Sequence, residues 1–277
     1  MEKTYRAINW NVLDDALDKA VWEKLTEQFW LDTRIPLSND LNDWKKMKEE
    51  EHALVEKVFG GLTLLDTLQS VDGMSALKKD ALTSHEAAVL NNIEFMESVH
   101  AKSYSSIFST LNTPAEIEEI FEWTEKNEYL QYKAEKICAI YRGDDALMKK
   151  AASVFLESFL FYSGFYAPLY FLGHNRLNNV AEIIKLILRD ESVHGTYIGY
   201  KFQIRYRALA EEEQEKLKFE IVNLLYDLYQ NEEKYTHELY DELGWTEDVG
   251  IFLRYNANKA LMNLGFEPLF EETATDV

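Results

Sequence analysis

The chain has 277 residues, of which 47% are hydrophobic and 13% aromatic, so it is long enough to bury a large core. Forty-nine acidic residues against 29 basic ones give a formal net charge of −20, which opposes binding to phosphate backbones and to anionic lipid surfaces. Eleven glycines and four prolines are too few for the repeated turns of an all-β protein. We therefore expect an all-α protein that binds neither nucleic acid nor membranes.

Apolar residues at helical spacing predict helices along the whole chain, and no linker divides them, so we expect a single domain over residues 1–277. Thr113 and Pro114 mark one helix start, with Thr as N-cap and Pro at the first helical position. The uncharged stretch 158–175 is shorter than the about 20 residues of a clean membrane span, so it predicts a buried core helix. The expected helices cover residues 14–29, 43–69, 80–111, 114–140, 146–172, 177–208, 210–241 and 246–263.

Cysteine usage and the N-terminal segment both bear on the compartment. Cys138 is the only cysteine, which excludes an intramolecular disulfide and fits a reducing environment. The start MEKTYRAINWNVLDD has no basic segment followed by an apolar run, so no secretory signal is predicted. Together these features favour a cytoplasmic protein.

Two short segments carry the same pattern, a glutamate followed three residues later by a histidine. They are Glu97 with His100 and Glu191 with His194. Within a helix this spacing places the carboxylate and the imidazole on one face. In ferritin-like bundles, two helices each supply such a pair, and two further helices each supply one carboxylate, to a dinuclear metal site. We therefore expect a ferritin-like bundle with a four-helix metal-binding core and flanking helices.

One carboxylate precedes each pair by a similar interval. Asp66 lies 31 residues before Glu97, and Glu157 lies 34 residues before Glu191. In an antiparallel pair of helices these intervals bring the acid and the pair to matching heights, so two packed hairpins bring six ligands to one point. Acids on such apolar faces cost several kcal/mol each unless they are paired or bind metal. Oxygen-rich ligation with two imidazoles favours iron or manganese over zinc.

A single Glu-x-x-His pair is weak evidence, because glutamate is frequent in this chain. For either histidine taken alone, a hydrogen-bonded core histidine is the simpler interpretation. A third pair, Glu49 with His52, lies in the charged run KKMKEEEH, and we expect it to form a solvated helix face. The metal hypothesis rests on four acids and two histidines arranged twice in the same order.

Tyr104 lies one helical turn after His100 and shares its face. The ordinary interpretation is a core tyrosine with a satisfied hydroxyl. Phe161, Phe165 and Ile187 share helix faces with the predicted ligands, so they are expected to wall a pocket around this tyrosine. A tyrosine beside a metal pair in such a pocket can be oxidised to a radical and shielded from water, although spacing alone does not establish a radical.

Three segments closely resemble the radical-generating small subunit of class I ribonucleotide reductase, in its bacterial class Ib form. They are NIEFMESVHAKSYSSIFSTL, LESFLFYSGFYAPLYFLG and AEIIKLILRDESVHGTYIGYKFQ. The resemblance runs from INWN near the N-terminus to MNLGFEPLF near the C-terminus. It implies a ferritin-like homodimer that passes a radical to a large subunit, where ribonucleotides are reduced to deoxyribonucleotides.

The resemblance also assigns roles to individual residues. The family's radical tyrosine corresponds to Tyr104, and its electron route runs from His100 through Asp190 to Trp30. Asp190 is placed to accept the second N–H of a ligating histidine, whereas the sequence alone favours plain core packing for Trp30. The family's six metal ligands, all matched in type, correspond to Asp66, Glu97, His100, Glu157, Glu191 and His194.

The implied cofactors are a dinuclear manganese or iron centre and a tyrosyl radical on Tyr104. Manganese assembly implies a small flavodoxin-like activator protein as a further partner, and iron assembly uses oxygen. The family usually extends into a tail that binds the large subunit through a segment with a relay tyrosine, and we assign no such tyrosine in FEETATDV.

Two alternatives to this interpretation stay open. The first is a ferritin-like dimetal oxidase or hydroxylase that acts on a small molecule without a large subunit, and Tyr104 counts against it. The second is a metal store or an interaction scaffold, in which Tyr104 and the pair of Trp30 and Asp190 would be coincidental.

Overall fold

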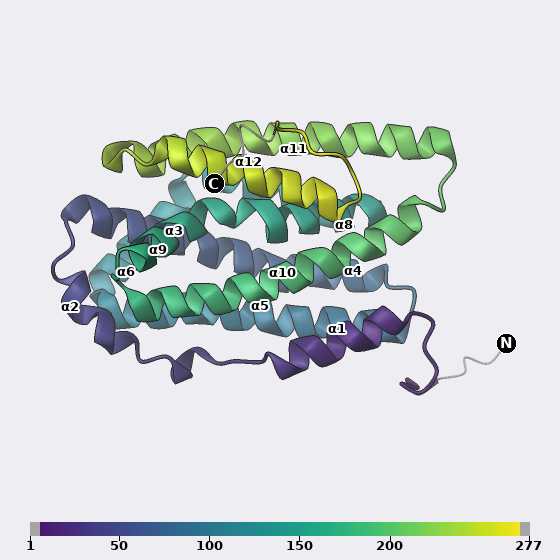
Figure 1. Cartoon of the computed structure of the whole chain (residues 1–277), viewed down its shortest axis with the longest axis horizontal. Coiled ribbons are helices and arrows are strands. Elements are labelled where there is room, and N and C mark those ends of the chain that lie inside the picture. Colours follow the sequence, from purple (N-terminus) through teal and green to yellow (C-terminus); the bar gives the residue numbers. More distant parts are fainter. Residues whose placement is uncertain (1–5, 272–277) are drawn as a thin grey trace.

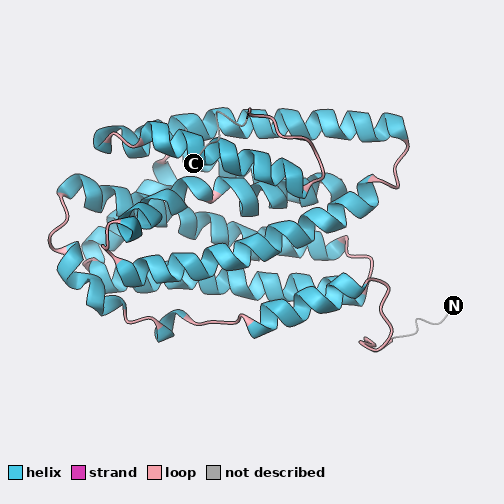
Figure 2. Cartoon of the chain, in the orientation of Figure 1, coloured by secondary structure: helices cyan, strands magenta, loops and turns pink. Residues whose placement is uncertain are grey.

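The computed structural model describes residues 6–271, and these residues form helices and no strand, which confirms the all-α prediction (Figures 1 and 2). Most of the long helices lie roughly along the long axis, with α11 and α12 together on one side (Figure 1). The longer helices are α1 (Ala16–Glu27), α3 (Glu49–Leu68), α5 (Ser84–Leu111), α6 (Pro114–Lys126), α7 (Glu128–Arg142), α8 (Ala146–Phe155), α9 (Tyr162–Gly173), α10 (Asn178–Tyr206), α11 (Glu211–Tyr240) and α12 (Thr246–Asn263).

Shorter elements account for most differences from the predicted helices. The expected helix 43–69 begins only at Glu49, because α2 (Leu41–Trp44) is separate and Glu51 accepts the Lys48 amide at 3.0 Å in a new helix start. Residues 69–79 were predicted as the end of one helix and the loop to the next, but they form a π turn (Gln69–Gly73) and α4 (Met74–Lys79). A second π turn (Leu156–Leu160) interrupts the expected helix 146–172 between α8 and α9.

The expected helix 114–140 is two helices. Its start is confirmed, since Thr113 and Glu116 form the reciprocal capping bonds and Pro114 occupies the first position. The break falls at Asn127, whose backbone is extended and whose side-chain oxygen accepts the amide of Leu130 at 2.8 Å. Asn127 therefore ends α6 and caps α7.

The core is organised around two helix pairs. α3 packs against α5, and α8 with the second π turn packs against α10. A Cβ at Gly60 would lie 2.9 Å from methyl carbons of Ile120 and Thr124, so α6 approaches α3 this closely only because position 60 is glycine. From the sequence, Gly60 and Gly61 weaken this helix by propensity and so predict a close helix contact, which the structure confirms. The uncharged stretch forms the largely buried helix α9, as predicted.

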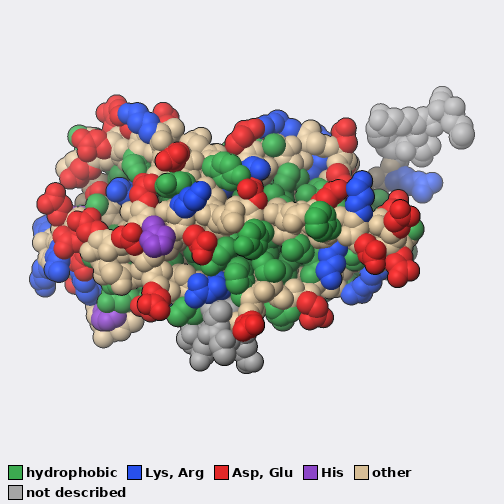
Figure 3. Space-filling view, turned by 90° about the horizontal axis from the view of Figure 1, so that it is seen from above, with side chains coloured by type: hydrophobic (Ala, Val, Ile, Leu, Met, Phe, Trp, Pro, Cys, Tyr) green, Lys and Arg blue, Asp and Glu red, His purple; other side chains and the backbone are tan. Residues whose placement is uncertain are grey.

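Among the described helices, none combines the length and the apolar character needed to cross a bilayer. Figure 3 looks onto the side of α11 and α12 and shows hydrophobic side chains in the middle with acidic ones around them. The exposed large hydrophobic residues on these two helices are Phe219, Tyr226, Tyr255 and Met262. Residues 1–5 and 272–277, which hold part of the N-terminal segment discussed above and most of FEETATDV, lie outside the described residues.

Candidate metal centre

All six predicted ligands lie together inside the bundle, and each is at most 1% exposed. They come from α3, α5, the second π turn and α10. Their ligand atoms form two groups, and within each group the atoms lie within 4.8 Å of one another. Glu97 and Glu191 belong to both groups, so they are placed to bridge two metal ions. The first group is Asp66, Glu97, His100 and Glu191, and the second is Glu97, Glu157, Glu191 and His194.

The two Glu-x-x-His pairs face each other across the centre. His100 Nδ1 lies 3.0 Å from Glu191 Oε1, which belongs to the opposite pair, and 3.6 Å from Glu97 Oε2. His194 Nδ1 lies 2.8 Å from Glu97 Oε1, again across the pairs, and the two imidazole rings are 6.0 Å apart. The i, i+3 spacing on α5 and α10 therefore aims both pairs at one point, as predicted.

The two single carboxylates complete the groups, one on each side. Asp66 Oδ1 lies 3.6 Å from His100 Nδ1, and Glu157 Oε2 lies 3.3 Å from His194 Nδ1. Asp66 is held by the last turns of α3, and Glu157 by the π turn that begins at Leu156. Each group would thus offer a metal ion one unshared carboxylate, one imidazole and the two shared carboxylates.

Most ligand atoms of this cluster have no hydrogen-bond partner, although all are buried. Unpartnered atoms are both oxygens of Asp66, Glu97 and Glu191, one oxygen of Glu157, Nδ1 of His100 and both ring nitrogens of His194. Burying so many unsatisfied polar atoms is costly unless a cation binds them. Four carboxylates also balance the charge of two divalent cations. The donor set fits a dinuclear manganese or iron centre.

Without cations, protons take over part of this charge balance. Burial raises the pKa of Asp66 to about 8, against the effect of the His100 imidazole. Burial would raise the pKa of Glu97, but the two imidazoles beside it lower this pKa to about 2. Burial alone would lower the pKa values of His100 and His194, yet the surrounding carboxylates raise both well above the ordinary value. Metal binding must therefore displace protons from this cluster.

Asp190 connects the centre to Trp30. Its Oδ2 lies 3.1 Å from His100 Nε2 and accepts the indole N–H of Trp30 at 2.7 Å. The Trp30 ring is 4% exposed and stacks on His100 with 5.9 Å between ring centroids. Trp30 therefore has a specific polar contact in addition to its core packing. Gln28 donates to the other Asp190 oxygen at 2.7 Å, a contact that the sequence did not signal because an isolated amide has no periodic partner.

Tyr104 is fully buried, and its hydroxyl has no hydrogen-bond partner among the described residues. Burial raises its pKa well above 10, and the negative charge of nearby Asp66 and Glu191 adds to this effect. Phe161, Phe165 and Ile187 are fully buried as well, as the sequence suggests. The ring that stacks on Tyr104, at 5.7 Å, is Phe59 from α3. Phe59 lies seven residues before Asp66 on the same helix, and the sequence pattern does not connect it with the tyrosine.

The third Glu-x-x-His pair is not a metal site, but the expectation of a solvated face is wrong for His52. Its ring is half-buried and stacks on Trp44 with 4.0 Å between centroids and 3° between planes. Its Nε2 also lies 2.6 Å from the Trp44 carbonyl oxygen. Trp44 of α2 therefore lies against α3, which a helical projection of α3 alone does not reveal.

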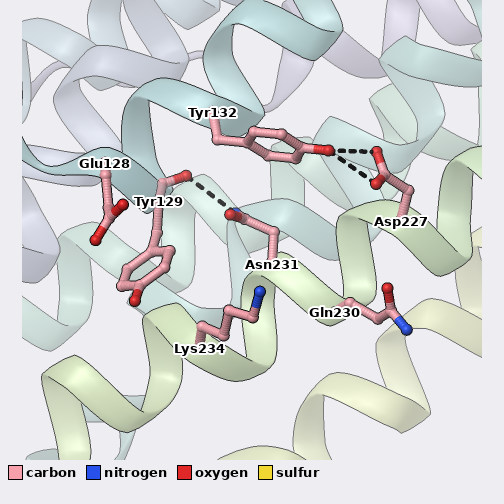
Figure 4. Close-up of a pocket in the computed structure, with 7 residues that line it drawn as sticks. All are labelled: Glu128, Tyr129, Tyr132, Asp227, Gln230, Asn231 and Lys234. Carbon is pink, nitrogen blue, oxygen red and sulfur yellow. Dashed lines mark hydrogen bonds between the residues drawn. The ribbon is translucent and has the colours of Figure 1, made fainter.

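A surface cavity of about 250 Å³ lies between α7 and α11, away from the six ligands (Figure 4). Some of its polar groups contact one another. Tyr132 donates to both oxygens of Asp227, and the amide of Asn231 donates to the carbonyl of Tyr129 at 3.0 Å. None of the six predicted ligands lines this cavity.

Comparison with known proteins identifies the family. Residues 7–276 match the model of the family described as "Ribonucleotide reductase, small chain". The chain belongs to this family. The small chain is 56% identical to the Mycobacterium tuberculosis ribonucleoside-diphosphate reductase subunit beta nrdF1 over 271 residues, which cover 98% of this chain and 84% of the relative. It is 55% identical to the Escherichia coli ribonucleoside-diphosphate reductase 2 subunit beta, with 98% and 85% covered.

Among solved structures, the small chain matches the dimanganese(II)-NrdF of Streptococcus sanguinis. The TM-score is 0.97 at 69% identity, with 99% of this chain and 97% of that chain covered. These relatives confirm the class Ib assignment, the ferritin-like bundle and the dinuclear metal cofactor, and they favour a reductase beta subunit over a stand-alone oxidase or a metal store.

Proposed function

We propose that this ribonucleotide reductase small chain holds its metal pair on Asp66, Glu97, His100, Glu157, Glu191 and His194 and stores a radical on Tyr104. The observation that carries the proposal is the unpartnered Tyr104 hydroxyl beside a cluster of unpartnered, buried ligand atoms. Manganese and iron both accept this donor set. The dimanganese form of the Streptococcus sanguinis relative supports manganese.

The surroundings of Tyr104 suit a stored radical. When bound, the oxidised metal pair supplies the oxidising power that removes one electron from the phenol. The phenolic proton must leave together with the electron, because the raised pKa keeps Tyr104 protonated and a buried cationic ring would be unstable. The nearby carboxylate of Asp66 would accept this proton. The product is a neutral phenoxyl radical. Complete burial and the stacked Phe59 ring keep water and reductants away from it.

We assign the hydrogen-bonded path of Trp30, Asp190 and His100 to electron transfer with the large subunit. During turnover an electron enters through Trp30 and reduces the Tyr104 radical, so that the oxidising equivalent moves to the partner. Asp190 joins the two rings through contacts of 2.7 and 3.1 Å. It also orients His100, as carboxylates commonly orient metal-binding histidines.

The deciding experiment is electron paramagnetic resonance on protein loaded separately with manganese and with iron and then activated. We expect a tyrosyl signal in the wild-type protein and none in Tyr104→Phe, while both proteins bind two ions per chain. Tyr240→Phe is the matched control, because Tyr240 is equally buried but donates to the Ser163 carbonyl. A radical that persists in Tyr104→Phe would refute the assignment. Two bound ions without a radical under any activation would favour the oxidase alternative.

Further proposals follow from family membership. A small chain implies a large catalytic subunit, and we propose that this chain acts with one as a homodimer in the cytoplasm. We also propose a flavodoxin-like activator for manganese assembly. A single domain over residues 1–277 stays a prediction, supported by one hydrophobic core that links helices from α1 to α12.

A further inference from the structure

A second series of hydrogen-bonded, buried side chains, besides the one through Asp190, reaches the metal centre and ends at Glu157. Its central member is Gln69, which is fully buried at the start of the first π turn, three residues after Asp66. The Gln69 side-chain amide donates to Glu157 Oε1 and, at 2.8 Å, to Ser153 Oγ. Its side-chain oxygen accepts the hydroxyl of Tyr141 at 2.6 Å. Both N–H donors of the Gln69 amide and one acceptor position of its oxygen therefore have fixed partners, which lie on α7, α8 and the second π turn.

This contact makes the two terminal carboxylates of the centre different. Both oxygens of Asp66 lack a hydrogen-bond partner and are free for metal. In Glu157 only Oε2 is unpartnered, and it is this oxygen that faces His194 at 3.3 Å. Oε1 is occupied by the amide of Gln69. Two ion positions with the same ligand types therefore receive unequal carboxylates.

The backbone around Gln69 is built for this contact. Gln69 and Glu157 both lie in π turns, whose extra residue rotates the following side chains relative to a regular α-helix. A Cβ at Gly73 would lie 2.3 Å from Gln69 Oε1 and 3.0 Å from a ring carbon of Tyr141. Any side chain at position 73 would push the Gln69 amide or the Tyr141 ring out of place. The absence of a side chain there lets the first π turn carry Gln69 to Glu157.

We propose that Gln69 is a positioning residue of the metal centre, which holds Glu157 so that it binds its ion through Oε2 alone. Tyr141 in turn fixes the orientation of the Gln69 amide. Glu157 would then offer its ion a single oxygen, whereas Asp66 can offer one or both of its oxygens to the other ion. This inference rests on the proposed function of Glu157 and Asp66 as metal ligands.

The test is a titration of metal-free protein with Mn(II), followed by electron paramagnetic resonance of free and bound ions. In Gln69→Leu we expect the ion on the Glu157 side to bind at least about tenfold more weakly, since partners of metal ligands typically contribute 10–100-fold to metal affinity. The spectrum of the dimanganese form should also change, because Glu157 gains a second free oxygen. Gln69→Met keeps the length of the side chain but has no N–H to donate to Glu157, so its loss should be similar.

Ser153→Ala is the matched control, because it removes the other acceptor of the same amide and leaves the contact with Glu157. We expect its Mn(II) affinities to stay within about threefold of the wild type. A loss equal to that of Gln69→Leu would show that packing around the amide matters and not the donation to Glu157, which would overturn the proposal. Unchanged affinities together with an unchanged dimanganese spectrum in Gln69→Leu would also overturn it.

Tyr141→Phe covers the case in which Gln69→Leu does not fold, as judged by its circular dichroism. This variant keeps Gln69 and removes only the donor that orients it, so we expect a smaller shift in the same direction. An unchanged spectrum in both Tyr141→Phe and Gln69→Met would then decide against the proposal. Wild-type protein that fails to bind two ions would instead refute the proposed function.

Discussion

Asp190 is a buried carboxylate that accepts hydrogen bonds from three side chains instead of binding metal. Its partners are Gln28, Trp30 and His100. Burial opposes its ionisation, but the contact with His100 lowers its pKa, so the group is charged at neutral pH. A charge held between an indole and an imidazole in this way both orients the ligand and links it to Trp30.

Replacing Asp190 separates metal binding from turnover. In Asp190→Ala we expect both ions to bind with losses of no more than about 10- to 100-fold. Nucleotide reduction with the large subunit should be abolished, because the path between Trp30 and His100 is broken. The measurements are metal content, the tyrosyl signal and turnover. Gln28→Leu is the control, because it removes a bond to the same carboxylate outside the path, and it should keep most of its turnover. Undiminished reduction by Asp190→Ala would remove Asp190 from the path.

At the residue scale, the ligands were predictable because each pair of Glu and His is a local pattern. The i, i+3 spacing on α5 and α10 fixes their common direction before any packing is known. Gln28 and Gln69 were not predictable, because a single amide in an apolar run has no period and its partner lies far away in sequence. The stacking of Phe59 on Tyr104 was missed for the same reason.

At the scale of the elements, α7 is joined to α11 by an ion pair inside the core. Lys133 and Glu232 are 1% and 0% exposed, and their charged atoms lie 2.6 Å apart. The Lys133 ammonium also lies 3.9 Å from the centre of the Tyr235 ring. Burial lowers the pKa of Lys133, and the charge of Glu232 only partly offsets this. Each charge therefore depends on the other.

Replacing one partner of this ion pair should destabilise the protein more than replacing both. We expect Lys133→Met to lower the free energy of unfolding by about 3–5 kcal/mol, because Glu232 is left charged and buried. The double variant Lys133→Met with Glu232→Leu should recover most of that loss. Urea unfolding followed by circular dichroism measures both. Lys126→Met, which breaks the exposed pair with Glu122, should leave the midpoint unchanged. A single variant at Lys133 as stable as the wild type would contradict this account.

Helix positions were predictable from periodicity, but breaks inside apolar runs were not. The helices 210–241 and 246–263 agree with α11 and α12 within a residue at each end. The break at Asn127 was hidden because α6 and α7 both continue the apolar spacing across it. The second π turn was hidden as well, since one extra residue inside an apolar run leaves the composition unchanged, whereas the first lies in the polar segment QSVDG, which was predicted as a loop. A π turn shows its effect only in the direction in which side chains such as Glu157 point.

At the scale of the whole molecule, metal-free protein should become less stable as pH rises from 6 to 8. The pKa of Asp66 is about 8 in the fold and about 4 in an unfolded chain, so the folded state binds more protons in this range. His100 and His194 act in the same direction, because their raised pKa values keep protons in the fold that an unfolded chain loses near pH 6.5. Bound cations replace these protons and remove the dependence.

Thermal unfolding of metal-free and Mn(II)-loaded protein at pH 6, 7 and 8 tests this. We expect the midpoint of the metal-free protein to fall with pH. Loading should raise the midpoint by more than about 10 °C at pH 8, because two ions at 1,000 times their Kd contribute about 4 kcal/mol each. Mn(II) affinity should increase over the same range as fewer protons have to be displaced. Parallel pH profiles for the two forms would contradict the proton balance described for the cluster.

The depth of the metal centre also sets how ions are exchanged. With every ligand side chain at most 1% exposed, an ion enters or leaves only when helices of the bundle part transiently. The rate at which one metal replaces another is then limited by this transient opening of the bundle, whatever the difference in affinity. Iron(II) generally binds such donors more tightly than manganese(II), yet a manganese pair installed first would outlast a later excess of iron. The history of loading, rather than equilibrium competition, would thereby decide which metal the enzyme carries.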